Sequence, residues 1–182
     1  MFSRLALIST IVASLLAFAV VGSIPAAEET PIISVAEGNI TMKAPAEWEK
    51  KDPRVRIIEA ELSVPPVEGD KDEGRCTIMG AGGSVQANID RWIGQFTSTT
   101  RNKTEKKTIA DQEVHVVDLA GTYKDQRGPF APAVLRKEYR MLGAIIVTQN
   151  RGQYFVKFYG PQATVSANEK AFQAMLDSLQ VK

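Results

Sequence analysis

Residues 139–159 have the sequence YRMLGAIIVTQNRGQYFVKFY, in which a polar turn separates two apolar segments. The turn at Asn150, Arg151 and Gly152 is typical of a β-hairpin. Side chains alternate across a strand, so one face of the first strand carries Tyr139, Met141, Ile145 and Val147 and the other carries Leu142, Ala144 and Ile146. Because both faces are apolar, the sheet that contains this strand has to be covered on both sides.

Two amphipathic segments can cover such a sheet. After Gly80, Gly82 and Gly83, Ser84 is a good N-cap for a helix whose apolar residues recur at helical spacing: Val85, Ile89, Trp92, Ile93 and Phe96. Near the end of the chain, Ser166 and Glu169 match a capping box, which is followed by the stripe Phe172, Met175, Leu176 and Leu179. The sequence therefore predicts an α+β fold, a largely antiparallel sheet sandwiched between helices.

Further strands are predicted at residues 39–43, 56–64 and 75–79, together with a hairpin of residues 106–110 and 113–123. Residues 56–64 alternate cleanly, which predicts a half-exposed strand. Its inward face would carry Ile58, Ala60, Leu62 and Val64, and its solvent face Glu59, Glu61 and Ser63.

The N-terminal segment resembles a secretory signal peptide. Arg4 precedes an uncharged apolar run from Leu5 to Val21, and small residues lead to Ala27. Cleavage there would make residues 1–27 a signal peptide, 28–37 a leader and 38–182 a single domain that is periplasmic or extracellular. No membrane span is predicted in the mature chain. The alternative is an uncleaved N-terminal membrane anchor, because the run is close to spanning length.

Charge excludes some classes of partner. Loss of residues 1–27 removes one of 22 basic residues and none of the 21 acidic ones, so the mature chain is formally neutral. Nucleic-acid binding and polybasic membrane recognition both need excess positive charge. We therefore expect neither.

The chain has one cysteine and one histidine. Cys76 alternates with Ile78, which favours a buried small hydrophobe over an intermolecular disulfide. His115 lies among valines in a predicted strand, and hydrolytic triads and most zinc sites need further ligands or partners. A structural role for His115 is favoured over a catalytic one, and no catalytic residue, metal or cofactor is predicted.

Two segments are candidates for binding. Gly82, Gly83 and Ser84 lie between a strand and a helix, where backbone N–H groups can hold an anion, although a tight turn also explains the glycines. In the loop of residues 124–132, prolines flank Phe130, so a partner could bind Arg127 and Phe130 with little loss of entropy. The alternative is that Phe130 packs into the core.

Three stretches give the chain a resemblance to the PsbP-like family: Gly38–Trp48, Ser84–Phe96, and Tyr154–Pro161 with the helix that contains Phe172 and Met175. The family includes an extrinsic photosystem II subunit, a Ran-binding transport factor and exported bacterial proteins. The resemblance implies an antiparallel sheet between helices and a non-catalytic docking role, and it transfers no binding residue.

These observations predict an exported, non-enzymatic accessory or protein-binding domain with a protein partner in the cell envelope. The alternative is a small-molecule or anion-binding module that uses the turn from Gly80 to Ser84. An enzyme would need a carboxylate or lysine activated by burial.

Overall fold

The computed structural model describes residues 30–126 and 131–182; the predicted signal peptide, Arg127 and Phe130 lie outside them. The strands are β1 (Ile32–Val35), β2 (Ile40–Lys43), β3 (Glu49–Lys51), β4 (Ala60–Val64), β5 (Gly74–Ala81), β6 (Phe96–Ile109), β7 (Gln112–Asp125), β8 (Val134–Val147), β9 (Gln153–Pro161) and β10 (Gln180–Val181). The helices are α1 (Val85–Ile93), α2 (Gln162–Ala167) and α3 (Glu169–Asp177).

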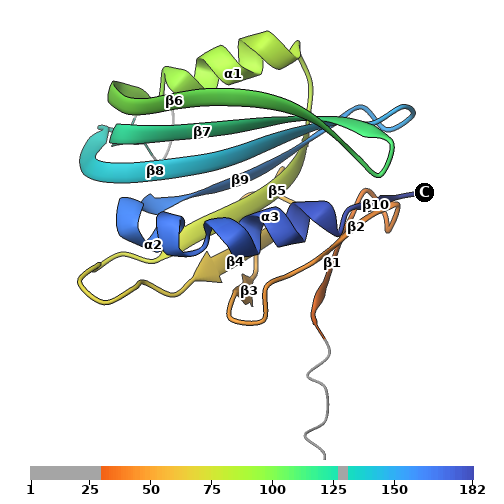
Figure 1. The fold of residues 1–182 in the computed structure, drawn as a ribbon, viewed down its shortest axis with the longest axis horizontal. Helices are drawn as coiled ribbons and strands as arrows, with labels where there is room; N and C mark the ends of the chain where they lie inside the picture. Colours follow the sequence, from red (N-terminus) through yellow and green to blue (C-terminus); the bar gives the residue numbers. More distant parts are fainter. Residues whose placement is uncertain (1–29, 127–130) are drawn as a thin grey trace, which may run out of the picture.

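All the strand pairs are antiparallel, in two sheets. A seven-stranded sheet has the order β3-β4-β5-β9-β8-β7-β6, and a three-stranded sheet has the order β1-β2-β10. The predicted hairpin of residues 139–159 is confirmed as β8 and β9, which lie near the middle of the large sheet. Figure 1 shows α1 and α3 on opposite sides of that sheet.

Helix α1 covers part of one face of the large sheet, as its apolar stripe predicts. Ser84 caps the helix by accepting a hydrogen bond from the backbone N–H of Ala87. Trp92 packs against Phe155 with ring centroids 5.2 Å apart. It also lies against Gly143, where an added Cβ would be 2.5 Å from the indole ring. The close approach of α1 to the sheet therefore depends on this glycine.

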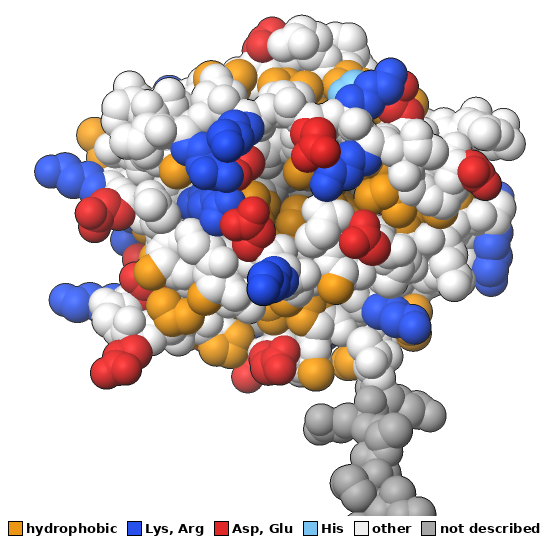
Figure 2. Space-filling view, in the orientation of Figure 1, with side chains coloured by type: hydrophobic (Ala, Val, Ile, Leu, Met, Phe, Trp, Pro, Cys, Tyr) orange, Lys and Arg blue, Asp and Glu red, His pale blue; other side chains and the backbone are white. Residues whose placement is uncertain are grey.

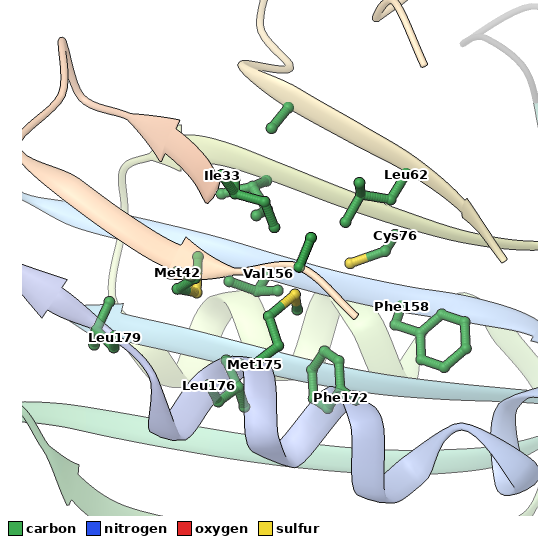
Figure 3. Packing of buried hydrophobic residues seen from close by; sticks show 14 of the residues in the cluster. Ile33, Met42, Leu62, Cys76, Val156, Phe158, Phe172, Met175, Leu176 and Leu179 are labelled. Carbon is green, nitrogen blue, oxygen red and sulfur yellow. The ribbon is translucent and has the colours of Figure 1, made fainter. Parts of the chain in front are cut away.

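The opposite face is covered by α3 together with the three-stranded sheet. Figure 3 shows Phe172, Met175 and Leu176 of α3 pointing toward the sheet, with Ile33 and Met42 of the small sheet in the same cluster. A largely antiparallel α+β fold is therefore confirmed. A sandwich between helices is not evident. Strands β1 and β2 cover one face together with α3, and on the other face the nine-residue helix α1 covers only part of the sheet.

Two strand predictions need correction. The segment of residues 28–37, predicted as a leader, contains β1, which pairs with β2. Strand β4 begins only at Ala60, and all five of its residues are buried. The expectation that Glu61 and Ser63 face solvent is wrong, because each is only 8% exposed. Glu61 instead binds Arg75, and the hydroxyl of Ser63 donates to Glu73.

The predicted capping box is also wrong. Ser166 lies inside α2, and Glu169 begins α3 without a side-chain cap at its N-terminus. Both side chains instead bind Arg140 of β8, with Oγ of Ser166 accepting at 3.0 Å and a Glu169 oxygen 2.9 Å from the guanidinium. The two residues therefore attach the helices to the sheet.

Candidate functional site

A cleft of about 980 Å³ lies on the α1 side of the large sheet, and no residue of α1 lines it. Its sheet residues are Lys51 of β3, Glu61, Leu62 and Ser63 of β4, Gly74 and Arg75 of β5, Tyr123 and Asp125 of β7, Arg136 and Tyr139 of β8, and Tyr159 and Gly160 of β9. The wall is completed by Asp52, Arg54, Val55, Ile58, Lys71, Asp72, Glu73 and Gln126. The cleft therefore occupies the part of this sheet face that α1 leaves uncovered.

Arg75 and Glu61 form the central ion pair of the cleft. The guanidinium donates two hydrogen bonds to the Glu61 carboxylate at 2.8 and 2.7 Å, and a third to the hydroxyl of Tyr159 at 2.8 Å. The hydrogen bonds from Arg75 hold the pKa of Glu61 below its usual value, while the carboxylate raises the pKa of Arg75. Both groups therefore stay charged and fixed in position.

A second set of ion pairs joins β7 and β8 to the 71–73 segment. Arg136 lies 3.3 Å from Asp125 and 3.2 Å from Asp72. The hydroxyl of Tyr139 donates to Asp72 at 3.1 Å. Burial raises the pKa of Tyr139 to about 12, with help from its hydrogen bond to Asp72. This wall of the cleft is polar and already paired.

Three tyrosines pack together beside a lysine. Tyr123 stacks on Tyr139 with centroids 6.0 Å apart and tilts against Tyr159 at 5.4 Å. The Nζ of Lys157 lies 5.3 Å from the Tyr123 centroid and 4.8 Å from that of Tyr159, within cation–π range. Burial, with smaller effects from Arg91 and Arg75, lowers the pKa of Lys157 to about 7.

Exposed apolar side chains border the cleft. Val55 and Ile57 are 49% and 67% exposed and belong to the segment that supplies cleft residues Arg54 and Ile58. Val134 is 51% exposed and pairs with Asp125, so its side chain is on the cleft face with Asp125 and Arg136. Leu135, 58% exposed, is on the opposite face of β8. We call Val55, Ile57 and Val134 the apolar rim.

The predicted anion-binding turn, Gly82, Gly83 and Ser84, lies at the N-terminal end of α1. The Oγ of Ser84 accepts from the N–H of Ala87 at 3.2 Å. The Gly82 carbonyl accepts from Asn88, and the Gly83 carbonyl accepts from Gln153, each at 3.0 Å. None of Gly82, Gly83 and Ser84 lines the cleft. Anion binding at this turn stays a prediction.

The remaining candidates are placed as follows. Cys76 is fully buried in the α3-side core, as predicted, and burial raises the pKa of its thiol. The Nε2 of His115 lies 2.7 Å from a Glu113 oxygen. Among residues 30–126 and 131–182, no three His, Cys, Asp or Glu side chains are grouped to hold a metal, and no helix is long and apolar enough to cross a membrane.

The sequence prediction missed Glu61, Arg75 and Lys157. Strict alternation in β9 places Lys157 on the same face as Phe155 and Tyr159. A lysine on an otherwise apolar strand face is a sequence signal that could have identified Lys157 as a candidate site residue. The ion pair of Arg75 with Glu61 could be predicted only from the register between β4 and β5, and the sequence of neither strand determines that register.

Comparison with known proteins identifies the fold. No family model and no curated protein matches the chain. The solution structure of cyanobacterial PsbP (CyanoP) from Synechocystis is 11% identical with a TM-score of 0.54, covering 89% of this chain and 99% of that one. The Ran-binding protein Mog1p of Saccharomyces cerevisiae is 12% identical with a TM-score of 0.48, covering 83% and 94%.

A Pseudomonas aeruginosa protein of unknown function is 12% identical with a TM-score of 0.49, covering 84% of this chain and 96% of that one. Identities this low show similarity of fold alone. The likeness to CyanoP extends over nearly the whole of that protein, in agreement with the resemblance found in the sequence. The chain therefore has the PsbP-like fold.

Proposed function

We propose that this chain is an exported, non-catalytic accessory protein that binds a partner protein through the cleft and its apolar rim. The observation that carries the proposal is the position of the exposed apolar side chains. Of the five large hydrophobic residues that are exposed in the described part of the chain, three form the rim, and Ile32 and Leu135 lie elsewhere. Grouped apolar exposure of this kind marks interaction surfaces.

The cleft adds the residue types that dominate binding energy at protein interfaces. Arg75, Arg136, Tyr139 and Tyr159 line it, and arginine and tyrosine are enriched among interface hot spots. Their hydrogen bonds hold them in one arrangement, so binding would order few side chains.

Charge pairing supports a binding role over a catalytic one. Glu61, Asp72 and Asp125 are each bound by an arginine, and the hydrogen bonds from Arg75 lower the pKa of Glu61. A carboxylate that acts as a general base would instead need a raised pKa, and Lys157, the amine whose pKa burial lowers, does not line the cleft. Acidic and basic side chains are also interspersed across the face in Figure 2, as expected for a surface without a single-sign field.

The location of the partner follows from the N-terminal segment. Residues 1–27 are predicted as a signal peptide on sequence alone, so the partner would be a protein of the cell envelope. Fractionation of cells that express the full chain, with N-terminal sequencing of the recovered protein, tests this part. Recovery of an uncleaved protein in the cytoplasm would contradict it.

The binding surface can be tested with matched substitutions. Val134 and Ile32 are 51% and 58% exposed, but only Val134 belongs to the rim. We expect chemical crosslinking in the native envelope to capture the same partner with the wild type and with Ile32→Asp, and to lose it with Val134→Asp. A protein that crosslinks to nothing, or an undiminished yield with Val134→Asp, would overturn the proposal.

A further inference from the structure

Lys157 is a partly buried cation without an acidic partner. It lies in β9 between Phe155 and Tyr159, and its Nζ donates to the side-chain oxygen of Gln95 at 2.6 Å and to the hydroxyl of Tyr123 at 3.4 Å. A lysine ammonium has three N–H donors. These two contacts leave one donor for which residues 30–126 and 131–182 provide no hydrogen-bond acceptor.

The charged and titratable groups around Lys157 come from every neighbouring element: Glu61 of β4, Arg75 of β5, Arg91 of α1, Tyr123 and Asp125 of β7, Tyr139 of β8 and Tyr159 of β9. Both acids are occupied, because Glu61 binds Arg75 and Asp125 binds Arg136. Neither carboxylate is therefore available to neutralise Lys157.

Arg91 is a second nearby cation. Its guanidinium carbon lies 5.8 Å from the centroid of Phe155, and it forms no ion pair within the described part of the chain. Phe155 also neighbours Lys157 on the same face of β9. Arg91 is exposed and Lys157 is partly accessible, so an ion from solution can reach both.

We infer that Lys157 and Arg91 form a binding site for a carboxylate group. Buried charges in proteins are normally paired, and the ammonium of Lys157, which packs against Gln95, Tyr123 and Tyr159, has no acidic partner in the described residues. The exposed guanidinium of Arg91, which also acts on Lys157 electrostatically, is the nearby cation that can share an anion with it. A carboxylate has the size and the two acceptor oxygens to take the free N–H of Lys157 and the fork of Arg91 together. The inference does not rest on the proposed partner, because a free organic acid could bind in the same way.

Binding of a carboxylate has to be linked to protonation of Lys157. In the empty site burial lowers the pKa of this amine to about 7, and a bound anion would raise it again. The ligand therefore binds the protonated form. Affinity should be constant below pH 7 and should fall about tenfold per pH unit above 7, until the pH reaches the pKa of the complex.

Titration with sodium acetate, followed through the NMR resonances of the Lys157 side chain, tests the site. We expect saturable shifts at pH 6 and an affinity about a hundredfold weaker at pH 9. Lys157→Met should abolish binding and Arg91→Gln should weaken it, whereas Arg151→Gln, an exposed arginine bound to Asn39, should not affect it. Circular dichroism would confirm that each variant is folded.

A second titration, with an acidic peptide, distinguishes a carboxylate of a polypeptide from that of a free organic acid. Tighter binding of acetyl-Glu-Glu-Glu-amide than of acetate would indicate an acidic polypeptide, and equal affinity would indicate a free acid. Lys157 resonances that do not respond to acetate, or the same affinity at pH 6 and pH 9, would overturn the inference. Loss of acetate binding would leave partner capture through the rim unchanged, so the two proposals fail separately.

Discussion

Gly143 and Lys157 face each other across β8 and β9, and they mark a boundary on the α1 side of the sheet. Gly143 has no side chain, so the ring of Trp92 lies directly on the strand. Lys157 instead extends toward Gln95 and the tyrosines. The apolar cover by α1 therefore ends between two paired residues, and the polar cleft begins there.

The space above Gly143 can be tested by adding one methyl group. Gly143→Ala should lower the free energy of unfolding by about 1–3 kcal/mol, because the new Cβ would overlap the Trp92 ring. Gly82→Ala is the matched control, since nothing lies within 4 Å of a Cβ at that position. Urea denaturation measures both, and equal stability of the two variants would contradict the packing.

Lys157 should make stability depend on pH. Its pKa in the folded state is about 7, below the value near 10.4 of a free lysine, so between these values only the unfolded chain takes up a proton. The wild type should therefore lose stability as the pH falls from about 9.5 to 7. Lys157→Met should remove this component, as seen by comparing urea midpoints at both pH values. Parallel pH profiles for the two proteins would contradict the burial of the amine.

At the level of elements, one ion network attaches α2 and α3 to the large sheet. Arg140 of β8 donates to both oxygens of Asp118 at 2.9 Å and also binds Ser166 and Glu169. Burial alone would raise the pKa of Asp118, but the hydrogen bonds from Arg140 and Arg101 outweigh it and lower that pKa. The helices are thus fixed by a polar contact as well as by their apolar stripe.

Breaking this network should cost more than breaking a surface pair. Asp118→Asn should lower the free energy of unfolding by about 3 kcal/mol at pH 7, because Arg140 remains buried with an incomplete partner. Glu49→Gln, which breaks the exposed pair with Lys51, should have little effect.

The same variant has a defined pH dependence. Because the pKa of Asp118 is lowered in the folded state, its stabilising effect is complete above about pH 4 and is lost as the pH falls through the folded-state pKa. The difference between wild type and Asp118→Asn should therefore shrink in acid. A constant difference down to pH 2 would contradict the role of the carboxylate.

Elements with strong local signals could be predicted from the sequence. The β8–β9 hairpin, the Ser84 cap and the stripe of α3 all depend on spacing within one segment. The cleft could not be predicted, because the residues around Glu61 alternate as they do in a half-exposed strand. Only the pairing of β4 with β5 places Arg75 beside Glu61. Ser166 and Glu169 matched a local motif, but Arg140, 26 residues before Ser166, determines their role.

At the scale of the whole molecule, the two faces of the large sheet differ in composition. The α3 side is a continuous apolar core that includes the small sheet. The α1 side is divided into an apolar part under the helix and a polar, hollowed part bordered by exposed hydrophobic residues. Under our proposal the first face stabilises the fold and the second binds a partner protein.

Site-specific photo-crosslinking tests this division most directly. A photoreactive amino acid would replace Ile57 of the rim or Ile32 of β1, which are 67% and 58% exposed, in cells that make the protein. We expect a discrete crosslinked product from position 57 and none from position 32. Products from position 32 alone, or from neither position, would contradict the account.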